Sequence, residues 1–270
     1  MEKNKEISLV SDNYHVLDKT FELIRSCYKH NDWEEAEVIC QHMRKIAEKL
    51  YSDQKKWGDI LPSYLKRPII FYIGYSYLAE SILYQKQRRF TEAKEAIQQY
   101  AKLDRYELFD QNSQEEIERF QHFAKANSYA NDILSGNRAS LGDYVEFLKL
   151  DEEEVLPGLI TILEAANFNG WIIDEAISEF IPKELEAFSC YEDQGNRVYY
   201  IKLLNQLAIY EFGRKNYNKT IEYILSYLTK AVKMDAHREF IVIISMFETI
   251  RSFATSDQEN CYQLILKGAC

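Results

Sequence analysis

The sequence predicts an all-α protein, arranged as an α-solenoid of about six antiparallel helix pairs. Three observations predict this fold. The chain of 270 residues contains only 9 glycines and 4 prolines, which leaves little material for strands and hairpin turns. Apolar residues recur three and four positions apart along most of the chain, as they do on one face of a helix. The turns between these helical runs are short, and helices joined by a short turn lie antiparallel.

The first predicted helix pair lies near the N-terminus. Apolar residues at helical spacing first appear in Tyr14–His30, so residues 1–12 are expected to form a short tail. Asn31 and the aspartate after it supply a turn. From Trp33 to Leu50 the apolar residues form one continuous stripe, which predicts a second helix lying back along the first.

The clearest pair begins near Pro68. Its first helix is expected to end around Tyr84, and Phe90 opens the second. A small residue, Ala93, follows three positions after that aromatic residue, and a large apolar residue, Ile97, follows four positions later. A small side chain at this place lets the two helices approach closely, while the aromatic ring covers the turn.

This pattern resembles the tetratricopeptide repeat, in which an aromatic, a small and a large residue occur at this spacing. It returns twice, at Trp33, Ala36 and Cys40, and at Tyr217, Thr220 and Ile224. The intervals between the small residues are not multiples of the usual period of about 34 residues. The repeats are therefore degenerate, with variable loops, and residues 13–268 are expected to form one domain.

Capping boxes predict further helix starts, because an acid three residues after a capping side chain reaches back to the first free N–H groups. They are formed by Ser113 with Glu116, Ser140 with Asp143, Asp151 with Glu154, and Ser256 with Glu259. A helix is also expected at Trp171–Phe180. About twelve helices result, which is enough for a concave solenoid surface.

Charge and hydropathy exclude several classes of partner. The formal net charge is −10, and the basic residues are scattered, so direct binding of nucleic acid by this chain is not expected. No run of about 18 apolar residues is available to cross a membrane, and the N-terminus lacks the apolar segment of a signal peptide. A cytoplasmic protein that does not bind membranes is expected.

Motifs of catalysis and of cofactor binding are also missing from the sequence. The five histidines are scattered, and neither a phosphate-binding glycine loop nor a serine nucleophile elbow occurs. The five cysteines form no Cys-x-x-Cys pair and are expected to be reduced thiols without a function. No metal and no cofactor is expected, and the protein is not expected to be an enzyme.

The resemblance to tetratricopeptide proteins implies which residues line a ligand groove. If Thr220 marks the small-residue position, Lys202, Asn205 and Ile209 lie on the groove-lining face of the preceding helix. Asn205 is the strongest candidate, because a carboxamide donates and accepts hydrogen bonds and so holds the backbone of an extended peptide. The alternative, an asparagine that caps a turn or is hydrated, stays open.

The same alignment, counted back from Ala93, places Tyr75, Leu78, Ile82 and Gln85 on the groove-lining face of the earlier pair. Two more asparagines, Asn127 and Asn167, lie on the apolar stripes of their own helices. Each either contacts a ligand or is a buried polar group tied to a loop.

From about residue 12 to residue 268 the chain resembles the regulatory region of the tetratricopeptide-repeat peptide-pheromone receptors of Gram-positive bacteria. This resemblance implies binding of short signalling peptides, as in quorum sensing, and control of transcription or of a response-regulator pathway. In many members a helix-turn-helix domain precedes the repeats, and this sequence contains none. DNA binding would therefore require a domain that is missing from this chain.

Three functions remain open at this stage. The first is a peptide- or protein-binding regulatory domain, and the second is a scaffold for protein–protein interaction without a small peptide ligand. The third is a phosphatase-like effector of a response-regulator pathway, for which no catalytic residue is identified. A homodimer is compatible with each, and the sequence does not identify the ligand.

Overall fold

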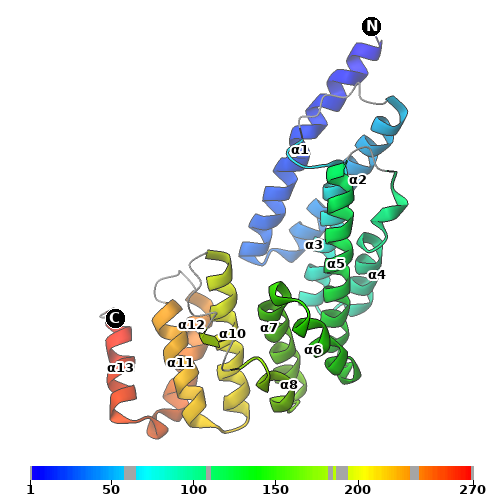
Figure 1. Ribbon diagram of the computed structural model, residues 1–270. Coiled ribbons are helices and arrows are strands. Elements are labelled where there is room, and N and C mark those ends of the chain that lie inside the picture. Colours follow the sequence, from blue (N-terminus) through cyan, green and yellow to red (C-terminus); the bar gives the residue numbers. More distant parts are fainter. Residues whose placement is uncertain are drawn as a thin grey trace. The chain divides into compact units, whose positions relative to one another are not determined.

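The structure, a computed structural model, describes residues 2–57, 65–107, 111–181, 185–186, 194–231 and 237–268. These residues form twelve α-helices and three short 3₁₀ helices, and none of them lies in a strand. The predicted all-α class is therefore confirmed. The chain divides into two compact units, Met1–Ser135 and Gly136–Cys270, which are described separately (Figure 1).

In the first unit each long helix packs against the next one along the chain. The helices are α1 (Glu2–His30), α2 (Trp33–Trp57), α3 (Ile69–Lys86), α4 (Phe90–Tyr100) and α5 (Gln111–Leu134). α1 contacts α2, α2 contacts α3, α3 contacts α4, and α4 contacts α5. α5 also packs against α3, so α3 has neighbouring helices on several sides.

The second unit contains a similar central helix. Its helices are α6 (Leu141–Lys149), α7 (Glu152–Asn169), α8 (Asp174–Ser178), α10 (Gln194–Gly213), α11 (Tyr217–Ala231), α12 (His237–Ile250) and α13 (Ser256–Leu266). α10 packs between α7 and α11, and α11 also contacts α12 and α13. α6 packs against α7.

The central helix α3 is apolar around most of its circumference, because a helix that is covered on several sides must bury several faces. α5 approaches α3 closely at Gly74. A Cβ atom added there would lie 2.5 Å from a ring carbon of Phe120 and 2.8 Å from a methyl carbon of Leu103. The missing side chain of Gly74 therefore sets how closely α5 packs against α3.

Three helix pairs are joined by the same turn. In the turns α1–α2, α3–α4 and α10–α11, one non-glycine residue is left-handed, with φ of 60° at Asn31, 62° at Arg88 and 62° at Lys215. The N–H of the following residue donates to the carbonyl five residues earlier, at 2.8 to 2.9 Å. This combination is the Schellman motif, which satisfies the last carbonyls of a helix.

A small residue follows each left-handed residue by five positions. These residues are Ala36, Ala93 and Thr220, and all three are fully buried. Each donates its backbone N–H to the carbonyl four residues earlier, at 3.0 Å. Ala93 belongs to the same core cluster as Tyr84, as the sequence predicts. The three pairs aligned from the sequence therefore share both the turn and the buried small residue.

Two predicted helix starts are wrong. α1 begins at Glu2, so residues expected to form a tail belong to the first helix. They lack an apolar stripe, but their Glu and Lys residues favour a helix. α5 begins at Gln111, so Ser113 lies inside the helix and is buried instead of capping it. The expectation of a single domain over residues 13–268 stays a prediction.

The capping box of the last helix forms one residue earlier than predicted. Thr255, and not Ser256, is the cap: its hydroxyl accepts from the N–H of Gln258, and the Gln258 side chain accepts from the N–H of Thr255. Thr255 has the extended backbone that a cap requires. Ser140 and Asp151 precede helices as predicted, but neither side chain makes a capping hydrogen bond.

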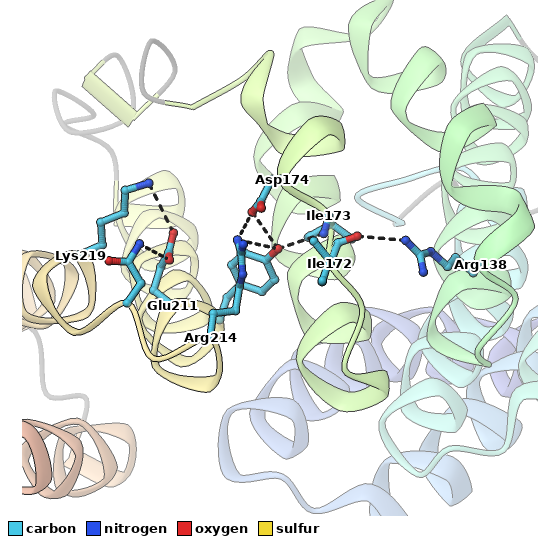
Figure 2. A network of polar contacts seen from close by, with 9 residues as sticks. Arg138, Ile172, Ile173, Asp174, Glu211, Arg214 and Lys219 are labelled. Carbon is cyan, nitrogen blue, oxygen red and sulfur yellow. Dashed lines mark hydrogen bonds and ion pairs between the residues drawn. The ribbon is translucent and has the colours of Figure 1, made fainter.

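Only part of the helix expected at Trp171–Phe180 forms, namely α8. The residues before α8 are held by polar contacts instead (Figure 2). The N–H of Ile173 donates to the Tyr210 hydroxyl at 2.9 Å, and the Arg138 side chain donates to the carbonyl of Ile172 at 3.0 Å. A helix starting at Trp171 would have paired the Ile172 carbonyl internally, whereas the N–H of Ile173 would belong to its first turn and would still need an outside acceptor.

Candidate functional site

The predicted groove-lining residues of α10 lie on the accessible side of that helix. Lys202 is exposed, and Asn205 and Ile209 are partly exposed. Four of the five residues between them are buried, namely Leu203, Leu204, Leu207 and Ala208, and Gln206 is partly exposed. Positions 202, 205 and 209 are separated by three and four residues, so they follow one line along the helix. A ligand on this side would meet a cation, an amide and an apolar side chain in turn.

Asn205 has an unsatisfied acceptor on this line. Its Oδ1 atom is buried and accepts no hydrogen bond from any residue that the structure describes. A buried polar atom without a partner costs about 1–3 kcal/mol, so such atoms are rare unless a ligand or water satisfies them. Asn205 is therefore the candidate residue with the clearest need for a donor.

Asn167 serves a different purpose. Its Nδ2 group, on α7, donates to the backbone carbonyl of Gln206 at 3.0 Å and to the Gln206 side-chain oxygen at 2.9 Å. Gln206 lies on α10, next to Asn205 in the sequence. The Asn167 side chain therefore joins two helices. We interpret it as a support for the line formed by Lys202, Asn205 and Ile209, which we call the α10 stripe.

Lys202 lies beside an aromatic residue of its own helix. Its Nζ atom is 5.8 Å from the centre of the Tyr199 ring, near the outer limit of a cation–π contact. Burial, with a smaller contribution from Glu154, raises the pKa of Tyr199. The neutral Tyr199 ring and the Lys202 ammonium group thus extend the stripe by one turn toward the start of α10.

A polar network fixes the other end of α10 (Figure 2). The Tyr210 hydroxyl donates to Asp174 at 3.0 Å, and Arg214 pairs with the same carboxylate. The buried Glu211 carboxylate accepts from the Asn216 side chain at 2.9 Å. The network holds the start of α8 against α10. The polar groups named here already bond to one another, so this end of α10 is a weaker candidate for ligand binding.

In the first unit, the predicted groove-lining residues of α3 also form its accessible stripe. Tyr75, Leu78, Ile82 and Gln85 are partly exposed, whereas most of the other residues of α3 are buried. Gln85 Nε2 donates to the backbone carbonyl of Asn127 on α5 in a long hydrogen bond of 3.5 Å. The structure therefore brings Gln85 and Asn127 together.

Tyr75 packs within an aromatic cluster at the start of α3. Its ring stacks on Phe71 with the centroids 5.6 Å apart, and its centroid lies 4.7 Å from that of Phe21. Burial raises the pKa of Tyr75 to about 12, so its hydroxyl is protonated at neutral pH. The same cluster contains Arg67, which we did not identify from the sequence. Arg67 lies in the bend before α3, so no helical spacing in the sequence marks it as part of the cluster.

The seven predicted residues thus form two groups, one in each compact unit. The second unit contains Lys202, Asn205, Ile209 and Asn167, and the first contains Tyr75, Gln85 and Asn127. Each group lies on a central helix and the helix packed against it. The group in the second unit is the stronger candidate, because it includes the unsatisfied acceptor of Asn205.

The thiols and acids of the described residues do not suggest other chemistry. Cys27, Cys40 and Cys261 are free thiols, and burial raises the pKa of Cys27 and of Cys40. Cys190 and Cys270 lie outside the described residues. Among the residues placed in the structure, no cluster of three His, Cys, Asp or Glu side chains could hold a metal ion, and no helix is long and apolar enough to span a membrane.

Comparison with known proteins adds no constraint on the site. No model of a known protein family matches the chain, and neither the curated proteins nor the solved structures contain a significant match. Function is therefore inferred from the residues and their geometry.

Proposed function

We propose that this chain is a regulatory α-solenoid of the tetratricopeptide type that binds an extended peptide or protein segment. Three helix pairs support the proposed architecture, because they share a left-handed turn residue and a buried small residue. The accessible stripes of α3 and α10 support the proposed binding mode, because residues that would line a groove remain partly open on helices that are otherwise covered.

The observation that carries the proposal is the buried Oδ1 atom of Asn205 without a donor. The residue is partly exposed, and rotation of its carboxamide would turn the oxygen toward the accessible side of α10. An extended peptide presents backbone N–H groups along its length, and one of them would then satisfy this atom whatever the peptide side chains are. Asn167 does not compete for the role, since its amide group already bonds to Gln206.

The length of the stripe suggests the size of the contact. Seven helical positions separate Lys202 from Ile209, which corresponds to about 10 Å along the helix axis. An extended chain covers that distance with about three residues. We therefore expect the α10 stripe to contact a short stretch of a ligand, with Lys202 near an acidic or carbonyl group and Ile209 against an apolar side chain.

The first experiment is native mass spectrometry of the purified chain, which detects peptides that copurify. A peptide found in this way is then titrated against the parent, Asn205→Ala and Asn218→Ala by calorimetry. Asn218 is an exposed asparagine at the start of α11 and serves as the matched control. Asn205→Ala should weaken binding by about one to two decades, which corresponds to about 1–3 kcal/mol, at nearly unchanged thermal stability. Asn218→Ala should behave as the parent.

Two results would contradict this assignment. Unchanged affinity in Asn205→Ala would show that the carboxamide does not contact the peptide. A large loss of stability in Asn205→Ala would show that Asn205 belongs to the packing of α10. The regulatory role in a bacterial transcription or signalling pathway, and the cytoplasmic location, are parts of this proposal that rest on the resemblance to peptide-pheromone receptors.

A scaffold without a peptide ligand is the second candidate, and one observation favours it. Ile241 and Val242 on α12 are 69% and 52% exposed, and adjacent exposed apolar residues are typical of surfaces that contact another protein. If this surface carries the function, Ile241→Ser should abolish capture of a protein partner, while Asn205→Ala leaves capture intact. The opposite pattern would favour the peptide-binding function.

A further inference from the structure

A guanidinium group that has no polar side-chain contact with the described residues lies against two aromatic rings in the first unit. Arg67 precedes α3, and its central carbon is 4.6 Å from the ring centre of Phe21 and 4.6 Å from that of Phe71. Phe21 is on α1 and Phe71 on α3, so the two rings hold the group from two helices. A guanidinium group that contacts two rings keeps a defined orientation.

The guanidinium group of Arg67 donates no hydrogen bond to any residue that the structure describes, whereas the Arg67 backbone bonds to the Tyr72 hydroxyl. The guanidinium group also forms no ion pair with any residue in the described part of the chain. The group carries five N–H donors in a planar fork, which matches the two oxygens of a carboxylate. Arg67 is also only partly exposed, so water does not surround it fully.

A second donor belongs to the same aromatic cluster. Tyr75 stacks on Phe71 and lies 4.7 Å from Phe21, measured between ring centres. Its side chain is partly exposed, and its hydroxyl makes no hydrogen bond to a described residue. The rings of Phe21 and Phe71 are therefore flanked by a guanidinium group and by a phenol hydroxyl, and both of these groups donate hydrogen bonds.

The acids near the cluster are paired with groups other than the Arg67 guanidinium. Arg25 also lies over Phe21, at 5.7 Å, but it pairs with Glu22 at 3.4 Å. Glu116 is affected by the charge of Arg67, yet its ion pair is with Arg119, at 3.3 Å. Asp18 is also nearby, and its carboxylate accepts from the Tyr72 hydroxyl, whose backbone partner is Arg67. Arg67 therefore has acidic neighbours but no direct ion-pair partner among the described residues.

We propose that Arg67 and Tyr75 form a binding site for a carboxylate group, supplied by the C-terminus or by an acidic side chain of a peptide. The Arg67 fork would hold both carboxylate oxygens, and the Tyr75 hydroxyl would donate to one of them. The site belongs to the first unit and uses none of the residues of the α10 stripe. The carboxylate site can therefore be tested separately from the role of Asn205, and failure of one proposal does not contradict the other.

Small probes test the site directly. The ¹⁵N-labelled chain is titrated with N-acetylglycine, which carries only a C-terminal carboxylate, and with N-acetylglutamate α-amide, which carries only a side-chain carboxylate. N-acetylglutamine α-amide, which carries neither, is the neutral control, and inorganic phosphate is the test for a different anion. Saturable shifts of the amide signals of residues 67 and 69–75 are expected with at least one carboxylate probe, and none with the neutral control.

Variants connect the signal to the proposed groups. Arg67→Gln should weaken carboxylate binding at least about tenfold, and Tyr75→Phe, which keeps the ring, should weaken it about three- to tenfold. Arg105→Gln is the matched control, because Arg105 also lies over a tyrosine ring, at 5.3 Å from that of Tyr106, but already donates to Gln99. Binding to Arg105→Gln should equal binding to the parent.

Several results would overturn the proposal. The first is no saturable shift with either carboxylate probe, and the second is an equal shift with the neutral control. The third is tighter binding of phosphate than of both carboxylates. The fourth is unchanged carboxylate affinity in Arg67→Gln. Circular dichroism verifies that each variant is folded. If Arg67→Gln does not fold, Tyr75→Phe decides the question, since unchanged affinity in that variant also contradicts the site.

Discussion

At the scale of single residues, asparagines of similar sequence setting have different surroundings. Asn205 has a buried oxygen without a donor, whereas Asn167 bonds to Gln206 on the neighbouring helix. The carbonyl of Asn127 accepts from Gln85. The sequence places all three on helix stripes, but it does not reveal which backbone groups a neighbouring helix will present. The sequence therefore indicates candidate positions, which stay predictions, but not the partners of their side chains.

Gly74 and Gly142 offer a matched pair of glycine-to-alanine substitutions. An alanine Cβ at position 74 would clash with Phe120, so Gly74→Ala should lower the free energy of unfolding by about 1–3 kcal/mol. Gly142, in the first turn of α6, has no atom within 4 Å of the added Cβ. Gly142→Ala should raise the free energy of unfolding by up to about 1 kcal/mol, because alanine favours the helix. Urea unfolding measures both, and equal effects would contradict the close contact at Gly74.

At the scale of elements, the sequence predicts the helix pairs better than it predicts the helix starts. The pairs depend on local patterns, because an aromatic residue and a small residue at fixed spacing determine how two consecutive helices pack. Helix starts depend on competition between neighbouring caps. Thr255 caps α13 in preference to Ser256, and Ser113 lies inside α5 because that helix begins at Gln111. A capping box in a sequence does not indicate which of two adjacent residues will be extended.

Ala93 tests the packing inside the clearest pair. Its side chain is fully buried and packs in one cluster with Leu83 and Tyr84. Ala93→Leu should lower the free energy of unfolding by about 1–3 kcal/mol, since the extra carbons have no space between the helices. Lys94→Leu places the same side chain at an exposed position and should change the free energy of unfolding little. Thermal unfolding compares the two, and a parental melting temperature for Ala93→Leu would refute the repeat alignment.

Lys215 tests the turn between α10 and α11. A left-handed conformation strains a residue with a Cβ by about 1–2 kcal/mol, and glycine avoids this cost. Lys215→Gly should therefore raise the free energy of unfolding by about 0.5–1 kcal/mol, after the larger entropy of glycine in the unfolded chain is subtracted. Glu222→Gly, at an exposed position inside α11, should lower it by about 1 kcal/mol. Destabilisation by both substitutions would contradict the left-handed turn.

At the scale of the whole molecule, each compact unit is built around one central helix that neighbouring helices cover. α3 has this place in the first unit and α10 in the second. The sequence predicts many helices and their pairing, but which helix becomes central depends on contacts between residues far apart in the chain. The apolar residues around most of α3 indicated burial without identifying the neighbours. The division into two units was not anticipated.

Buried tyrosines should make the folded protein sensitive to alkaline pH. Burial, assisted by Glu248, raises the pKa of Tyr262 to about 12, and burial raises that of Tyr223 to about 12. An unfolded tyrosine titrates near pH 10, so between about pH 10 and 12 the unfolded chain releases protons that the folded chain retains. The free energy of unfolding should therefore fall over this range, by up to about 1.4 kcal/mol per pH unit for each such group.

Tyr262→Phe separates one tyrosine from the rest. This change keeps the stacking on Phe247, whose ring centre is 3.8 Å away, but removes the ionisable hydroxyl. Urea unfolding between about pH 9 and 11 should show a smaller loss of stability in Tyr262→Phe than in the parent. Between about pH 7 and 9 the tyrosine is protonated in both states, so the two proteins should have parallel pH profiles there. Parallel profiles above pH 10 would contradict the raised pKa.

The repeated turn makes parts of the chain interchangeable. The segments Cys27–Ala36, Tyr84–Ala93 and Glu211–Thr220 have equal length and the same terminal hydrogen bonds, although their sequences differ. Each segment therefore ends one helix and starts the next with the same pair of backbone hydrogen bonds. A protein engineer could exchange one segment for another, or replace all three by a single consensus, and the joined helices would keep their lengths and register. The same turn could then join different helices, while the accessible residues of those helices are changed to bind other ligands.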